Sequence, residues 1–378
     1  MKIAFLTPEF PHAKTGTSGG IGTSIFNLSQ GLTQLGHKVL ILVYGQDCDA
    51  VFHENDVIIY KIKNIKVKGF SAYFTQKKIQ KLINHLHKNN ELDIVEAPDW
   101  TGFSAFIKPK CPLVIRLNGS DTYFCHLENR PVKWLNRYLE NRALQNCDGI
   151  ISVSRFTGEL TQKLFKLTKD FTVIPNAIDA QLYDNFEAND AQTILYFGTL
   201  IRKKGLLELP LLFNEVHKKI PNAVLLLVGK DASDIFSGST STWQLMQSLF
   251  TASALQQVRY LGAVSYDAIK TQIASATVCV FPTFAEALPV SWLEAMAMQK
   301  AIVASNIGWA KELLEDGKNG FLEYPKNHLA FAEKIVRLLE DEELRKTFGK
   351  EARNTVLLNF TIKVVAQQSV AFYKNYLD

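Results

Sequence analysis

Two carboxylates stand near the start of a predicted helix in the second half of the chain. Glu286 lies in a short loop after an apolar run, and Glu294 lies one helical turn past Pro289. Proline is tolerated in the first turn of a helix, and no Ser, Thr, Asp or Asn directly precedes it as a cap. The amide groups around Leu288 and Val290 can therefore bind a phosphate, while carboxylates can accept hydrogen bonds from sugar hydroxyls. Either glutamate alone fits a structural role, but together they predict a site for a phosphate-linked sugar.

Three successive cations follow the strand that is predicted to open the second half. Gly198 and Thr199 come directly after that strand, and Arg202, Lys203 and Lys204 come next. A glycine turn and cations at a strand end suit a diphosphate, whose charge grows as it leaves. A lone basic triplet is more often a surface loop, so this assignment depends on the neighbouring glutamates.

Paired glycines lie at the mouth of the first predicted helix. Gly20 and Gly22 allow the backbone to approach a phosphate or a sugar closely. Such turns also mark dinucleotide-binding domains, in which the turn is short and an acid ends the second strand. Here the loop runs over residues 8–22, and Asp47 comes two residues late. The pattern argues against a nicotinamide enzyme.

Polar residues at the end of a first-half strand are candidates for binding a ligand, because ligands bind at the carboxyl ends of the strands in such sheets. These are Arg116, Asn118 and Asp121. Asparagine cannot act as an acid or a base, but it can hold a hydroxyl by hydrogen bonding. For Asp121, a structural turn is an equally good interpretation.

The elements that would position these residues alternate between strand and helix in both halves. This alternation predicts an α/β fold of two Rossmann-like doubly wound parallel sheets facing a central cleft. The predicted elements of the first half are 3–7, 24–35, 39–43, 75–88, 94–97, 113–117, 133–145, 149–153, 157–165 and 171–174. Those of the second half are 193–197, 206–219, 223–228, 258–261, 266–275, 278–281, 290–298, 301–304 and 329–340.

The polar stretch at 185–192 is the predicted linker between two domains. The first domain covers 1–184, and the second covers 193–360. The segment 361–378 carries apolar residues after the second half is complete, and we expect it to return to the first domain.

Taken together, the motifs resemble the retaining glycosyltransferases of family 4, which have the GT-B fold. Their E-x7-E pattern is matched by Glu286 and Glu294, with seven residues between them. In that family the first glutamate contacts the transferred sugar and the second contacts the nucleotide ribose. The resemblance spans nearly the whole chain, and the other segments that carry it are 36–39, 173–179, 301–308 and 316–322.

The resemblance implies a set of site residues, with two departures. Lys204 matches the family lysine, but Thr199 stands where an arginine is usual, and Arg202 is the substitute three residues on. Asn118 stands where the family commonly has a histidine. The implied catalytic residues are Glu286, Lys204 and Arg202. The implied donor-binding residues are Gly20, Gly198, Thr199, Leu288, Pro289, Val290 and Glu294. The first domain would bind the acceptor, with Arg116, Asn118 and Asp121 as the implied residues, and the second domain would bind the nucleotide-sugar donor.

The implied activity is transfer of a hexose-type sugar from a UDP- or GDP-linked donor. The acceptor would be a glycan or a lipid-linked molecule in the synthesis of cell-surface polysaccharide or glycoconjugate. Two alternatives stay open. One is a sugar-nucleotide epimerase, which would need acid and base residues that Asn118 does not supply. The other is a non-catalytic sugar-nucleotide-binding subunit, which the departures at Thr199 and Asn118 favour and the retained Glu286, Lys204 and Glu294 oppose.

Composition adds limits of its own. The 378 residues are 47% hydrophobic, as in a globular protein, and the five cysteines form no CxxC pair. We expect a cytoplasmic enzyme with reduced thiols and without a cofactor. Asp47-Cys48-Asp49 is a formal DxD pair that we interpret as chance, so no metal is expected.

Eight lysines and no acidic residue fall within residues 60–88, although the net charge is only +5. The simple interpretation is a solvated helix face and a charged edge strand. The alternative is peripheral contact with the anionic inner face of a membrane. Nucleic acid is not expected, because no recognition motif is present. The lysines are Lys61, Lys63, Lys66, Lys68, Lys77, Lys78, Lys81 and Lys88.

Overall fold

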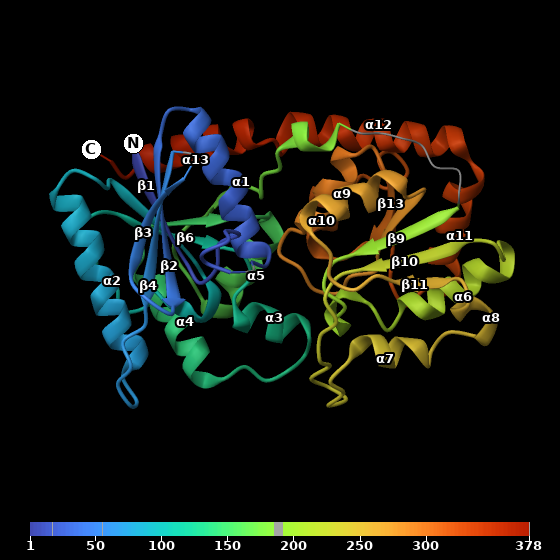
Figure 1. Ribbon diagram of the computed structural model, residues 1–378, viewed down its shortest axis with the longest axis horizontal. Coiled ribbons are helices and arrows are strands. Elements are labelled where there is room, and N and C mark those ends of the chain that lie inside the picture. The colour runs from blue at the N-terminus through green and yellow to red at the C-terminus, as the bar shows by residue number, and fades with distance from the viewer. Residues whose placement is uncertain (17, 55, 185–191, 378) are drawn as a thin grey trace. The chain divides into compact units, whose positions relative to one another are not determined.

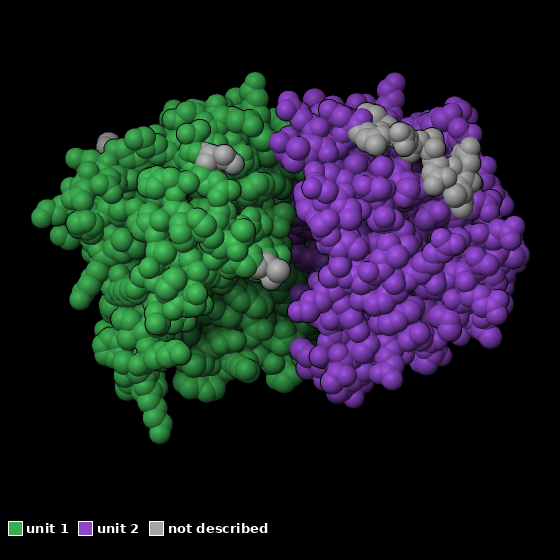
Figure 2. Space-filling model, viewed as in Figure 1, with its two compact units in different colours: residues 1–178, 360–378 green, residues 179–359 purple. Residues whose placement is uncertain are grey.

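The computed structural model describes residues 1–378 except 17, 55, 185–191 and 378 (Figure 1). The chain forms two compact units, which Figure 2 colours separately. Unit 1 comprises residues 1–178 and 360–378, and unit 2 comprises residues 179–359. The predicted linker at 185–192 lies, apart from Gln192, outside the described residues.

Unit 1 is built on an eight-stranded sheet in the order β3-β4-β2-β1-β5-β6-β7-β8. Its strands pair in parallel except for β3, which runs antiparallel to β4. The central strands are continuous apolar runs, as expected where helices cover both faces. The strands are β1 (Lys2–Thr7), β2 (Lys38–Gln46), β3 (Ala50–Glu54), β4 (Val57–Lys63), β5 (Ile94–Pro98), β6 (Leu113–Leu117), β7 (Gly149–Ser152) and β8 (Thr172–Val173).

Alternate side chains of β1 enter two separate cores. Ile3 and Phe5 pack in a cluster with side chains of α1 and α13, whereas Ala4 and Leu6 pack in a cluster with side chains of α2. This division follows from the two-residue period of a strand. The helices of unit 1 are α1 (Gly20–Gln34), α2 (Ser71–Lys88), η1 (Trp100–Gly102), α3 (Asp121–Leu127), α4 (Trp134–Asn146), α5 (Arg155–Phe165) and α13 (Ile362–Lys374).

Unit 2 is built on a six-stranded parallel sheet in the order β11-β10-β9-β12-β13-β14. Its strands are β9 (Thr193–Phe197), β10 (Val224–Val228), β11 (Val258–Tyr260), β12 (Val278–Phe281), β13 (Ala301–Ser305) and β14 (Phe321–Glu323). Its helices are η2 (Ala180–Tyr183), η3 (Arg202–Lys204), α6 (Leu209–Lys219), α7 (Thr242–Gln247), α8 (Ala252–Leu255), α9 (Tyr266–Ser275), α10 (Val290–Ala297), η4 (Gly308–Glu312), α11 (His328–Glu340) and α12 (Glu342–Asn359).

The expected fold class, two parallel-sheet α/β domains, is confirmed. The interpretation of the lysine-rich segment as an edge strand is wrong, because β4 lies between β2 and β3. The edge is β3, a short strand that carries no lysine and that the sequence pattern did not reveal. Among the described residues, no helix has the length and apolar character needed to cross a membrane.

Candidate active site

Two loops of unit 2 lie side by side because the strands before them are neighbours. Strands β9 and β12 pair in parallel, with Val278 opposite Ile194. The loops that follow therefore leave the same edge of the sheet. The carbonyl of Lys203 accepts hydrogen bonds from the amides of Phe284 and Ala285, at 2.9 and 3.2 Å. The cation-rich loop and the glutamate loop thus form one structure.

Gly205 makes the contact between these loops possible. Its φ of +74° lies in the left-handed region, and a Cβ at this position would lie 1.8 Å from the carbonyl oxygen of Pro282. No other residue can occupy such a position without moving the backbone. The glycine at the end of η3 thus serves close approach between the loops.

Lys204 and Glu286, both predicted as catalytic, form an ion pair. The Nζ atom of Lys204 lies 2.9 Å from Oε1 of Glu286, and their side chains are 22% and 15% exposed. Gly198 is close by, since a Cβ there would lie 3.5 Å from the same Nζ. Thr199 follows, and its carbonyl accepts a hydrogen bond from the Tyr196 hydroxyl at 3.0 Å. The structure therefore groups these predicted residues at one end of β9 and β12.

Glu294 lies inside unit 2 on α10, a helix that begins after Pro289 without a side-chain cap. Its Oε1 accepts hydrogen bonds from the hydroxyls of Tyr183 and Tyr266, each at 3.1 Å. Burial raises the pKa of Glu294 to about 7, against the opposing effect of these hydrogen bonds and of the charge on Lys204. The sequence pattern did not indicate the two tyrosines, because they come from distant segments that only the fold brings together.

Arg202 takes part in a different contact. Its guanidinium binds Asp234 with two hydrogen bonds, Nε to Oδ1 at 2.7 Å and NH2 to Oδ2 at 2.6 Å. The Asp234 side chain is almost fully buried and also accepts from the amide of Ser237. Hydrogen bonding to Arg202 holds the pKa of this carboxyl far below its usual range. Arg202 therefore anchors the 231–241 segment, a role that the sequence pattern did not reveal.

Gly20 is the first residue of α1 in unit 1, and Gly19 caps this helix without a side chain. The carboxylate of Glu9 lies at this helix start and accepts a hydrogen bond from the amide of Gly22 at 3.0 Å. Because a helix N-terminus favours a negative charge, the carboxylate of Glu9 stabilises the start of α1. The sequence pattern did not indicate Glu9.

Asn118 follows β6 and contacts Asp99, a buried acidic residue directly after β5. Its amide donates to Oδ1 of Asp99 at 2.9 Å. Burial, reinforced by the charge of Glu140, raises the pKa of Asp99 to about 8. Among the side chains that the structure describes, Oδ2 of Asp99 has no hydrogen-bond partner. Asp99 therefore positions the turn that carries Asn118.

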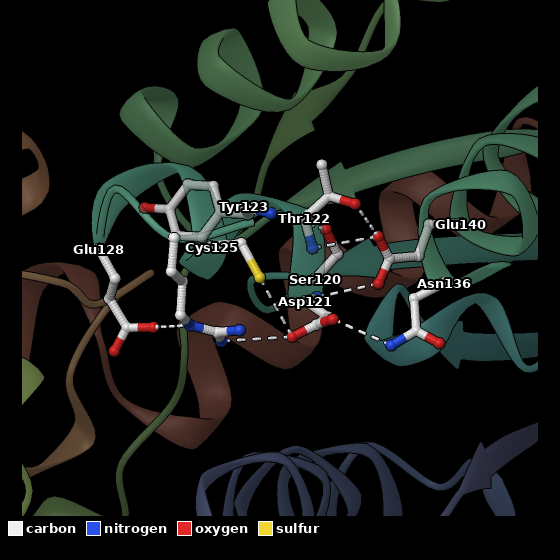
Figure 3. Close-up of polar contacts among 9 residues, drawn as sticks. Ser120, Asp121, Thr122, Tyr123, Cys125, Glu128, Asn136 and Glu140 are labelled. Atoms are coloured by element: carbon white, nitrogen blue, oxygen red, sulfur yellow. Dashed lines mark hydrogen bonds and ion pairs between the residues drawn. The ribbon is translucent and has the colours of Figure 1, made fainter. Parts of the chain in front are cut away.

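Asp121 is held within unit 1, as Figure 3 shows. Its carboxylate accepts from Asn136 at 2.9 Å and from Arg130 at 3.3 Å, while its amide donates to Glu140 at 2.9 Å. Cys125 makes a further contact through its Sγ. These contacts fix the segment 128–136 against the start of α3. They favour the structural-turn interpretation of Asp121 over a role in acceptor binding.

The Arg116 guanidinium is bound within unit 1. It is buried, and it donates to Glu96 at 2.7 and 3.2 Å and to the carbonyl of Ile174 at 2.9 Å. Glu96 in turn accepts from the hydroxyl of Tyr373 on α13 at 2.6 Å. This placement counts against the prediction of Arg116 as an acceptor ligand, because the guanidinium is used inside the unit.

Two family models match adjacent parts of the chain. The model described as Glycosyltransferase Family 4 matches residues 18–182, and the model described as Glycosyl transferases group 1 matches residues 179–355. The chain belongs to the family 4-type glycosyltransferases. This glycosyltransferase is 27% identical over 397 residues to an uncharacterized glycosyltransferase of Methanocaldococcus jannaschii, covering 99% of the chain and 98% of that relative.

Solved structures share the fold of this glycosyltransferase. Sucrose-phosphate synthase from Thermosynechococcus elongatus has a TM-score of 0.78 at 19% identity, with 99% of each chain covered. Anabaena HepE in complex with UDP has a TM-score of 0.74 at 19% identity, with 99% of this chain and 100% of that chain covered. These likenesses confirm the GT-B fold. The glycosyltransferase uses a nucleotide sugar.

Proposed function

We propose that this glycosyltransferase moves a hexose-type sugar from a nucleoside-diphosphate donor with retention of anomeric configuration. The observation that supports the proposal most is the ion pair of Lys204 with Glu286, which joins the two loops at the end of β9 and β12. In this proposal Glu286 contacts the transferred sugar and Lys204 stabilises the charge on the departing diphosphate. Glu294 accepts hydrogen bonds from the ribose hydroxyls.

The remaining donor contacts are proposed to come from backbone groups of the same loops. Gly198 and Thr199 would line the diphosphate beside Lys204, and the uncapped start of α10 at Leu288, Pro289 and Val290 would bind a phosphate. Gly20 in unit 1 would contribute backbone next to the donor. HepE is a protein of the same fold whose structure holds UDP, which favours a UDP-linked donor over a GDP-linked one.

Transfer is proposed to need no metal ion. The cations of the loop that contains η3 (Arg202, Lys203 and Lys204) supply positive charge at the donor site, although Arg202 is already paired with Asp234. Lys204 is proposed as the principal cation for the leaving group, because its Nζ atom lies beside Gly198 and Glu286. A positive charge fixed in place performs the stabilisation that a divalent cation supplies elsewhere.

Unit 1 is proposed to bind the acceptor, a glycan or a lipid-linked molecule in the synthesis of cell-surface polysaccharide or glycoconjugate. Asn118 is the residue that supports this assignment, since it follows β6 in a turn held by the buried Asp99. Its amide can orient an acceptor hydroxyl without taking a proton. Arg116 and Asp121 have no part in this proposal.

A donor-hydrolysis screen tests the proposal. Purified protein is incubated with UDP- and GDP-linked hexoses, and release of nucleoside diphosphate is followed with and without EDTA. We expect slow hydrolysis of one donor that EDTA leaves unchanged and that Glu286→Gln abolishes. Binding without turnover for every donor would favour the non-catalytic alternative, and interconversion of two nucleotide sugars would favour the epimerase.

The stereochemical part has its own test. Once a donor and an acceptor are in hand, the anomeric configuration of the product can be assigned by NMR from the coupling at the new linkage. Retention is expected. Inversion would overturn the retaining assignment while leaving the donor assignment intact.

A further inference from the structure

Large apolar side chains are exposed where α2 begins in unit 1. Val67, Phe70, Tyr73 and Phe74 are 41%, 61%, 41% and 41% exposed. The rest of the helix buries its apolar face, because Ile79, Ile83 and Leu86 lie in the core of the unit. The exposed side chains are therefore additional to those that attach α2 to its sheet.

The turn that presents these side chains is ordered by hydrogen bonds. The amide of Val67 donates to Oγ of Ser71 at 2.9 Å, and the same hydroxyl donates to the carbonyl of Val67 at 2.8 Å. The amide of Phe70 donates to the Val67 carbonyl at 3.0 Å, and the amide of Ile65 donates to Thr75 at 2.9 Å. The aromatic side chains are thus held outward by a fixed turn.

The N-terminal turn of α4 presents a second exposed set. Trp134, Leu135 and Tyr138 are 77%, 48% and 48% exposed. Phe106 connects the two helices, since its ring centroid lies 5.7 Å from that of Tyr73 on α2 and 4.7 Å from the guanidinium carbon of Arg142 on α4. In Figure 1 both helices begin at the lower edge of unit 1. We call these two exposed sets together the aromatic face.

Positive charge surrounds the aromatic face. Lys66 and Lys68 flank Val67, Lys133 precedes Trp134, and the segment after Phe106 carries Lys108 and Lys110. No acidic residue occurs between residues 60 and 88. The face therefore combines aromatic side chains with a one-sided positive charge.

Several lysines of residues 60–88 make contacts within unit 1, and we do not assign them to the aromatic face. Lys61 pairs with Asp47 at 2.6 Å, and Lys78 pairs with Asp49 at 2.6 Å. Lys77 donates to the carbonyl of Phe106 at 2.8 Å. We therefore expect only the lysines beside the aromatic face, and not the whole run at residues 60–88, to contact a membrane.

We propose that the aromatic face binds an anionic lipid surface, with Phe70, Phe74 and Trp134 entering the headgroup region and Lys66 and Lys68 lying near the lipid phosphates. Aromatic side chains beside lysines are typical of interfacial membrane contacts, whereas lysine is depleted from protein–protein interfaces. Each lysine near such a surface adds electrostatic attraction to the lipid phosphates, so two or three together give measurable binding. The inference rests on the proposed function in one respect: membrane binding would bring the enzyme to a lipid-linked acceptor.

Vesicle sedimentation tests the proposal. The full chain is mixed with vesicles of phosphatidylcholine alone or with phosphatidylglycerol added, at low and at high salt. We expect binding to the anionic vesicles only, weakened by salt. Phe70→Ser combined with Phe74→Ser should reduce the binding by about tenfold or more, because each removes a large apolar side chain from the lipid. Lys66→Gln combined with Lys68→Gln should weaken binding and its dependence on salt.

Leu358→Ser is the matched control, since Leu358 is 73% exposed on α12 of unit 2 and should not affect binding. Donor hydrolysis in solution should be the same in all these variants, so that a failure here is distinct from a failure of the proposed function. Equal binding of wild type and the Phe70/Phe74 variant would overturn the proposal, as would equal binding to neutral vesicles. A dimer that this variant dissociates, seen by size-exclusion chromatography without lipid binding, would assign the face to a second copy of the chain instead.

Discussion

At the residue scale, the proposed donor site depends on charges that are compensated within the protein before any substrate arrives. Lys204 pairs with Glu286, and Glu294 is held by two tyrosine hydroxyls. A substrate that binds here exchanges these contacts for its own. The effect of a substitution therefore depends on which partner is left without its counter-charge.

Removing either member of the Lys204–Glu286 pair should abolish transfer and leave the fold intact. We expect Lys204→Ala and Glu286→Gln each to lower kcat by about 100-fold or more, the usual cost of losing a group that stabilises charge in a transition state. Turnover measured with the donor found by hydrolysis, together with circular dichroism, checks this. A folded variant of either kind with near wild-type turnover would show that the pair is only structural.

Donor affinity should depend on pH through Glu294. The pKa of this carboxyl is raised to about 7 by burial, and the ionised form accepts hydrogen bonds from ribose hydroxyls more strongly than the protonated form does. Binding of UDP should therefore be weak below pH 6 and approach a plateau above pH 8. The hydroxyls of Tyr183 and Tyr266 and the charges of Lys204 and Lys270 all favour the ionised form.

The substitution Tyr266→Phe tests whether Glu294 causes the pH dependence of UDP binding. Losing one hydrogen bond to the carboxylate raises the pKa of Glu294 further, so the midpoint of the UDP-binding profile should move to higher pH. Isothermal titration calorimetry between pH 5.5 and 9 gives both profiles. A midpoint that Glu294→Gln leaves in place would assign the titration to another group.

At the element scale, the site depends on how two neighbouring parallel strands end. Strands β9 and β12 pair in register, so the loop that contains η3 and the loop before α10 leave the sheet at the same edge. The carbonyl of Lys203 then ties the second loop to the first. The positions of Lys204 and Glu286 therefore depend on both loops together.

Gly205→Ala should disrupt this pair of loops. A Cβ at Gly205 would lie 1.8 Å from the Pro282 carbonyl oxygen, so the backbone must separate and Lys204 must move away from Glu286. We expect a strong loss of kcat and a lower melting temperature. The measurements are turnover and thermal unfolding.

Gly262→Ala is the matched control for backbone strain. Gly262 has a similar φ of +70°, but a Cβ there would meet nothing within 4 Å. It should cost only the strain of a left-handed residue, about 1–2 kcal/mol, and leave turnover unchanged. Equal effects of the two substitutions would mean that strain, and not the close approach, explains the role of Gly205.

At the scale of the whole molecule, the chain completes unit 1 only after it has built unit 2. Residues 360–378 belong to unit 1, where α13 packs against α1. The amide of Ile178 donates to Phe360 at 2.8 Å, and that of Ile362 donates to Ile178 at 3.0 Å. Unit 1 therefore cannot close its core until the end of the chain has been synthesised.

Tyr373→Phe should lower the stability of the protein without affecting donor binding. The Tyr373 hydroxyl is buried and donates to Glu96, which also holds Arg116, so its loss leaves a buried carboxylate less well satisfied. The expected cost is about 1–3 kcal/mol in the free energy of unfolding, measured by denaturant titration. Tyr324→Phe, at a residue 45% exposed, is the control and should cost under about 0.5 kcal/mol. A cost for Tyr373→Phe as small as that of the control would contradict the network.

The sequence by itself determined the fold class, because strand and helix periodicity is local information. It also grouped Glu286 with Glu294, since both lie within a few turns of one strand end, and it placed Lys204 at the end of another strand. It missed β3, β14, α3, α7 and α8, whose short patterns carry little periodic signal. It also missed the 18-residue helix α12, in which most side chains are polar. The sequence also did not show that Lys61 and Lys78 pair with Asp47 and Asp49, because such pairing is not visible along the chain.

Only the tertiary structure decided which of these residues meet. Sheet order brings β9 beside β12 and so joins Lys204 to Glu286, although 81 positions intervene between them. Folding also buries Arg116 against Glu96, which turns a predicted ligand into an internal ion pair. Burial and long-range contact depend on strand order and packing, and these are set by the whole chain. For that physical reason, residue types and spacing indicate the chemistry, but the folded structure determines which side chains remain available for it.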